Sequence, residues 1–211
     1  MSPLFSIEPL AIAAVLLALG SIGLTALRSS LVFYGLQTVA LGLLAASLGA
    51  RHGEPLLVVV GLAVMALKGV AVPIYLRTVA LRIGCRRDEG LVVAPPLLMF
   101  ATLSVAALFA LTRTESDWIP SDALPGLALL MVGMLMMMTR RMAVSQIVGF
   151  LVLENGAFLY TISQPHAMPT VIELGVLMDV LAGTMLSGLL VFRINDTFEH
   201  ADVTELKELR G

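Results

Sequence analysis

Long apolar stretches separated by short polar segments organise this chain. Seven of them approach or reach the roughly 20 helical residues that are needed to cross a hydrocarbon core of about 30 Å. Backbone polar groups in lipid must be satisfied within their own segment, so these stretches predict helices and not strands. The predicted fold class is therefore an all-α polytopic membrane protein. Its predicted spans are residues 6–27, 30–49, 56–77, 91–111, 123–139, 143–163 and 171–192.

Proline and glycine refine this pattern. Pro73 lies inside the third predicted span, where a proline ring removes one backbone donor and leaves the carbonyl one turn earlier unpaired. We therefore expect a kink there. Glycines spaced along one helix, such as Gly35 with Gly42 or Gly175 with Gly183, indicate close contact between helices.

Four glycines recur at a constant offset of 114 residues and suggest an internal repeat. The matching pairs are Gly35 and Gly149, Gly42 and Gly156, Gly61 and Gly175, Gly69 and Gly183. A repeat would relate spans 1–3 to spans 5–7 in parallel orientation, and coincidence is the alternative. The corresponding division is residues 1–114 (helices 1–4), 115–195 (helices 5–7) and a polar tail at 196–211.

Basic residues fall on alternate connections and predict an orientation. One side carries only Arg51 and Arg113, whereas the other carries Arg28, Arg77, Arg82, Arg86, Arg87, Arg140, Arg141, Arg193, Lys207 and Arg210. The positive-inside rule then places the amino terminus outside and the carboxyl terminus in the cytoplasm. No basic residue precedes the first stretch, which favours a retained span over a cleaved signal peptide.

Composition excludes several classes of function. The chain is 58% hydrophobic and 13% charged, about half the charge of a soluble domain, and its net charge of −2 gives no reason to expect nucleic-acid binding. A single cysteine, Cys85, excludes disulfides and cysteine-ligated clusters within the chain. No histidine lies in a predicted span, and no phosphate loop or nucleophilic triad is present. We expect no cofactor, no metal site and no catalytic centre in this chain.

Three ionisable residues lie near the middle of predicted spans: Lys68, Glu154 and Asp179. Such residues are expensive to insert alone, so they normally face protein or water and mark ion pathways. Burial favours the neutral form of an ionisable group, which lets it take up and release protons as a relay requires. We therefore identify these three as candidate proton-relay residues.

Other roles compete with the relay. Glu154 and Lys68 could form a static ion pair that holds two helices together, and Asp179 could bond Thr184 or a carbonyl freed near Pro73. Glu173 lies near the outer end of the last span, about 9 Å of helix rise from Asp179. It is a further relay candidate, with a solvated helix-end carboxylate as the alternative.

Nearly the whole chain resembles component E of hydrogenase-4-type complexes. The residues concerned are G-x-x-x-x-E-N-G at Gly149–Gly156, E-x-G-x-x-x-D at Glu173–Asp179, and L-x-x-L-x-G at Leu206–Gly211, with K-G-V-x-x-P at Lys68–Pro73 in the third span. Residues 115–195 are also similar to the small three-helix K subunit of respiratory complex I and to its small counterpart in Mrp-type cation/proton antiporters. Asp179 matches the second membrane carboxylate of the K subunit, whereas the first falls at Leu151, one helical turn before Glu154.

This resemblance implies a non-catalytic membrane-arm subunit of a complex-I-like oxidoreductase, of the group 4 NiFe hydrogenase or formate hydrogenlyase type. It would lie in the bacterial cytoplasmic membrane, between antiporter-like subunits and the subunit that anchors the redox arm. Its buried charges would relay protons or coupling ions. The alternatives are a subunit of a Mrp-like cation/proton antiporter or inorganic-carbon uptake complex, or a structural spacer.

Overall fold

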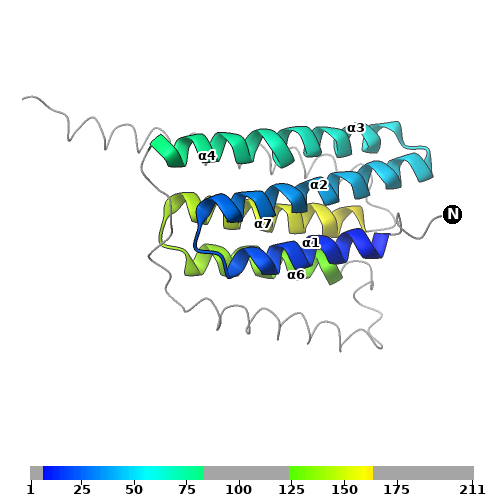
Figure 1. The fold of residues 1–211 in the computed structure, drawn as a ribbon. Coiled ribbons are helices and arrows are strands. Elements are labelled where there is room, and N and C mark those ends of the chain that lie inside the picture. Colours follow the sequence, from blue (N-terminus) through cyan, green and yellow to red (C-terminus); the bar gives the residue numbers. More distant parts are fainter. Residues whose placement is uncertain (1–6, 83–123, 164–211) are drawn as a thin grey trace, which may run out of the picture. The chain divides into compact units, whose positions relative to one another are not determined.

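The computed structural model describes residues 7–82 and 124–163, and every regular element in these two ranges is a helix. The first range contains α1 (Ile7–Ile22), α2 (Leu27–His52), α3 (Pro55–Ala63), the π-helix η2 (Val64–Ala71) and α4 (Val72–Arg82). The second contains α6 (Leu124–Thr139) and α7 (Ala143–Ile162). As Figure 1 shows, α3, η2 and α4 run end to end as one long helix.

Three of the described helices are long and apolar enough to cross a membrane: Leu27–His52, Pro55–Leu81 and Ala143–Ile162. They correspond closely to the predicted spans 30–49, 56–77 and 143–163. Shorter apolar helices, Pro9–Ile22 and Leu124–Thr139, overlap the predicted spans 6–27 and 123–139. The predicted spans 91–111 and 171–192 lie outside the described residues, so the expected total of seven stays a prediction.

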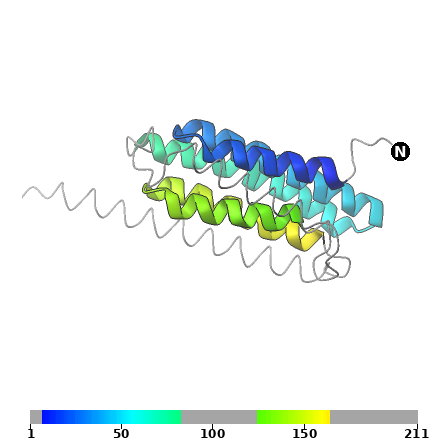
Figure 2. The same cartoon turned by 90° about the horizontal axis from the view of Figure 1, so that it is seen from below.

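Helix α2 is the common neighbour of the described helices. It packs against α1, α3, η2, α4 and α7, while α6 packs against both α7 and α1. Figures 1 and 2 show these helices running alongside one another in both views. The consequence for function is that α2 lies beside both η2 and α7, which carry the ionisable residues predicted for the relay.

Glycines bring the helix backbones together, as their spacing predicts. A Cβ added at Gly61 would lie 2.6 Å from the carbonyl oxygen of Gly42, and one at Gly35 would lie 2.9 Å from that of Gly69. These contacts join α2 to the long α3–α4 helix. A Cβ at Gly156 would lie 2.5 Å from the backbone nitrogen of Leu130, which joins α7 to α6 in the same way. Small residues permit such approach in a membrane, where packing drives helix association.

The internal repeat is tested only in part by these contacts. Helix α1 packs on α2 and α6 packs on α7, as the repeat requires of equivalent pairs. However, Gly35 and Gly42 face the α3–η2 segment, whereas Gly149 and Gly156 face α6. Gly175 and Gly183 lie outside the described residues, as do the proposed division points at 114 and 195. The repeat and the three-part division stay predictions.

Arg140 closes one end of the helix group. It lies between α6 and α7 and is buried, and its Nη2 donates to the carbonyls of Ser21 at 3.2 Å and Ile22 at 3.0 Å. These carbonyls end α1, where a helix leaves its last acceptors unpaired and favours a cation. The opposite end holds the turn from α2 to α3, which Gly53 makes with a φ of 70°.

Candidate functional site

Glu154 is held in the protein interior by α7. The buried residues of this helix include Val148, Leu151, Val152 and Leu159. Packing of these apolar side chains places Glu154 in the interior as well. Its side chain is only 2% exposed. A carboxylate within an apolar run is therefore accommodated here because the acid faces protein.

Lys68 approaches Glu154 from the long helix on the other side of α2. The lysine Nζ lies 3.1 Å from Oε1 of Glu154, and the lysine side chain is 12% exposed. This ion pair joins α7 to η2 through two residues that are 86 positions apart in the sequence. In a low dielectric such a pair attracts far more strongly than in water, and the attraction offsets part of the desolvation of both charges.

The backbone that carries Lys68 is a π-helix. Eight residues, Val64–Ala71, form η2, and Lys68 lies within it. Pro73 lies two residues after the end of η2, and its missing N–H and its ring disfavour regular α-helical bonding in the preceding turn. Among the described residues, the irregularity of this helix is the π-helical segment before Val72, and the kink expected at Pro73 stays a prediction. Such segments are rare and occur frequently at functional sites.

A second polar link joins α7 to α2 next to the ion pair. Asn155, adjacent to Glu154, donates from Nδ2 to Oγ1 of Thr38 at 2.8 Å. Thr38 in turn donates to the carbonyl of Tyr34, one turn earlier in α2, at 2.9 Å. Both side chains are fully or almost fully buried. The hydrogen bond holds α7 against α2, and the ion pair holds α7 against η2.

Gln37 is the residue of this region that sequence reasoning missed. It is 0% exposed, and within the described residues neither its amide nitrogen nor its amide oxygen has a hydrogen-bond partner. The Oδ1 atom of Asn155 is also buried and has no hydrogen-bond partner among the described residues. Buried amides are normally satisfied by protein groups or by internal water. The signal in the sequence was the polar pair Gln37–Thr38 inside an otherwise apolar run.

The remaining predicted relay residues, Asp179 and Glu173, lie outside the described residues. Of the alternatives weighed for Glu154, the ion pair with Lys68 is present in the structure. The titration that a relay requires stays a prediction. Within residues 7–82 and 124–163, no three His, Cys, Asp or Glu side chains gather as a metal site needs.

Comparison with known proteins gives two levels of similarity. Over 202 residues, 93% of the chain, it is 24% identical to hydrogenase-4 component E of Escherichia coli and of Shigella flexneri, and covers 94% of that protein. It is 34% identical over 195 residues to the uncharacterized protein Rv0085 of Mycobacterium tuberculosis, with 87% of the chain and 86% of that protein covered. No protein-family model matches, and no solved structure matches significantly. The chain therefore belongs to the same family as the uncharacterized protein Rv0085 of Mycobacterium tuberculosis.

Proposed function

We propose that this protein is a non-catalytic membrane-arm subunit of a complex-I-like oxidoreductase, of the group 4 NiFe hydrogenase or formate hydrogenlyase type. Two findings support a subunit of this kind. Three of the described helices have the length and apolar character of membrane spans. The distant similarity to hydrogenase-4 component E extends over nearly the whole chain. The redox centres would belong to partner subunits, and the chain would lie beside antiporter-like subunits and the subunit that anchors the redox arm.

Within that assembly, the role that fits this chain best is the relay of protons or coupling ions. The observation that carries it is the buried pair of Lys68 and Glu154, with side chains 12% and 2% exposed. Protonation of Glu154 would remove its charge and its attraction for Lys68. The change of field at Lys68 would then favour proton movement at the next ionisable group, for which Asp179 and Glu173 are the candidates.

The hydrogen-bonded surroundings support transfer at this position. Asn155 and Thr38 fix the part of α7 next to Glu154 against α2. The unpartnered amide of Gln37, within the part of the chain the structure describes, offers two further polar atoms for internal water. Proton transfer needs a connected set of polar groups, and we propose that internal water at these atoms of α2 would extend the set beyond the ion pair.

The test is proton pumping by the assembled complex in inverted membrane vesicles. We expect Glu154→Gln and Asp179→Asn each to lower the pumped protons per turnover at least several-fold, because a neutral amide cannot carry the proton. Glu54→Gln is the matched control, since Glu54 is an exposed carboxylate of the α2–α3 turn. Pumping at the wild-type level in both buried-site variants would reject the relay.

A structural spacer is the second candidate, and the same ion pair favours it, because a static pair would also join η2 to α7. The double variant Lys68→Met with Glu154→Gln separates the two. Removing both charges leaves no buried unpaired ion, so the complex should assemble. A spacer predicts that the assembled double variant pumps normally, whereas a relay predicts that it assembles and does not pump.

A further inference from the structure

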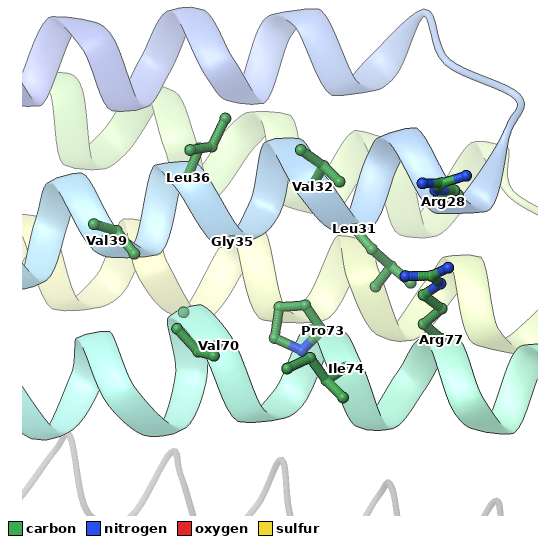
Figure 3. Close-up of a pocket in the computed structure, with 11 residues that line it drawn as sticks. Arg28, Leu31, Val32, Gly35, Leu36, Val39, Val70, Pro73, Ile74 and Arg77 are labelled. Atoms are coloured by element: carbon green, nitrogen blue, oxygen red, sulfur yellow. The ribbon is translucent and has the colours of Figure 1, made fainter.

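A groove of about 390 Å³ lies between α2 and the η2–α4 part of the long helix. This volume is within the range of sites that hold small molecules. Two arginines, Arg28 of α2 and Arg77 of α4, line one end, as Figure 3 shows. The remaining lining is apolar: Leu31, Val32, Gly35, Leu36, Val39, Gly69, Val70, Pro73 and Ile74.

Among the described residues, no carboxylate balances the positive charge at the arginine end. Arg28 and Arg77 are both exposed, and no acidic residue lines the groove. The described residues include only three carboxylates. Glu8 belongs to the opposite end of α1, Glu54 lies in the turn between α2 and α3, and Glu154 is buried beside Lys68. Two guanidinium groups at one site match the geometry and charge of a phosphate.

The apolar part has the length of one leaflet. Arg28 and Val39 are eleven residues apart in α2, about 16 Å of helix rise. One leaflet contributes half of a hydrocarbon core of about 30 Å. Side chains along the groove are largely exposed, with Val70 at 51% and Ile74 at 61%. Gly35 and Gly69 carry no side chain, so the helix backbone lines the groove at these two positions.

We propose that this groove binds one anionic phospholipid. Its phosphodiester lies between Arg28 and Arg77, and one acyl chain runs along the apolar floor past Gly35 towards Val39. The groove passes from cationic to apolar along the helix axis in the same direction as such a lipid passes from headgroup to chain. A free anion would leave the apolar length unused. An apolar helix of another subunit would leave the two guanidinium groups without a counter-charge.

The test uses the purified full-length protein, within its complex where it co-purifies, and native mass spectrometry with phosphatidylglycerol or phosphatidylcholine. We expect the wild type to retain one phosphatidylglycerol with at least about tenfold preference over phosphatidylcholine. Arg28→Gln with Arg77→Gln should abolish that preference. Arg141→Gln is the matched control, because Arg141 is exposed and lies outside the groove. Circular dichroism verifies that each variant is folded.

A second arm tests the apolar length. Ile74→Trp, at an exposed position, should narrow the groove and weaken retention of phosphatidylglycerol while both arginines remain. Equal retention of the two lipids by the wild type would overturn the proposal, as would a double arginine variant with full preference. If inorganic phosphate bound as tightly as phosphatidylglycerol, the groove would be an anion site and not a lipid site, and the proposal would be overturned. A photo-cross-linker at Val32 that captures a polypeptide in the assembled complex, in place of lipid, would also overturn it.

Discussion

Single side chains in this protein bind helices to one another at buried polar positions. Lys68 and Glu154 join η2 to α7, and Asn155 joins α7 to Thr38 of α2. Arg140 joins the α6–α7 connection to the end of α1. In a low-dielectric surrounding such contacts are strong when complete and destabilising when one partner is removed. Their effects should therefore be measurable one residue at a time.

Arg140→Gln should destabilise the protein, because it removes a buried cation whose guanidinium group bonds two terminal carbonyls of α1. Hydrogen bonds of charged groups contribute about 1.5–3 kcal/mol each. Because two such bonds are lost, we expect a loss of at least about 1.5–3 kcal/mol and a lower midpoint of thermal unfolding in detergent. The neighbouring substitution Arg141→Gln, at an exposed position, should leave the midpoint unchanged. Equal midpoints for both variants would contradict the capping role.

Gln37→Leu should separate stability from function. The change removes two buried polar atoms that have no partner among the described residues, so the free energy of unfolding should stay the same or rise. If the amide binds internal water for transfer to or from Glu154, proton pumping by the assembled complex should fall several-fold. Gln146→Leu is a control at an amide already bonded to the carbonyl of Arg140 at 2.8 Å. It should lower stability without a specific effect on pumping per assembled complex.

At the scale of elements, the long helix from Pro55 to Arg82 is not uniform. Its middle is the π-helix η2, between regular helices α3 and α4. Bonding from residue i to i+5 widens the turn and changes the direction of the side chains that follow. The direction of Lys68 towards Glu154 thus depends on backbone geometry that Pro73 helps to set.

Pro73→Ala should weaken the Lys68–Glu154 contact, because alanine restores the N–H that favours regular α-helical bonding. The measurement is the yield of the direct amide cross-link that a hydrophobic carbodiimide forms between the Lys68 amine and the Glu154 carboxyl group, quantified by mass spectrometry after proteolysis. We expect a fall of at least several-fold with alanine at position 73. Pro55→Ala is the control, since Pro55 begins α3, where the proline N–H would have no helical partner anyway. A yield that does not change with Pro73→Ala would show that η2 persists without the proline.

At the scale of the whole molecule, the described connections separate by charge. Arg28 in the first turn of α2 lies at the same end as Arg140 and Arg141, whereas Arg51 in the last turn of α2 and Glu54 lie at the opposite end. In a membrane, the more basic side is expected to face the cytoplasm. The proposed headgroup site at Arg28 and Arg77 would then draw on the anionic lipids of the cytoplasmic leaflet.

Cysteine labelling in intact cells tests this orientation. In a Cys85→Ser background, a membrane-impermeant maleimide added outside should label Arg51→Cys and should not label Arg141→Cys. In inverted vesicles the reagent should label Arg141→Cys and should not label Arg51→Cys. Both positions are exposed, so a difference in labelling reports the side of the membrane and not burial. The reverse pattern would invert the orientation and place the two-arginine end in the outer leaflet.

The sequence by itself determined the helical class, the limits of the described spans and the identity of the buried ions. Helices α2, α3–α4 and α7 begin and end close to the predicted limits, because the length of an apolar run must match the thickness of the bilayer. The unusual presence of Lys68 and Glu154 in such runs was enough to select them as candidates. The glycine spacing likewise predicted which faces approach closely, within the described residues.

Only the tertiary structure determines which of these ionisable residues contact one another. The sequence left Lys68 with several possible partners, and the fold directs it to Glu154. It also buries Gln37, turns Arg140 inward to the end of α1, and forms a π-helix just before Pro73. A hydropathy pattern indicates where along a membrane-spanning helix a residue lies. It does not indicate the direction in which the side chain faces. That direction depends on the rotation of neighbouring helices, and these rotations are fixed by packing between segments far apart in the chain.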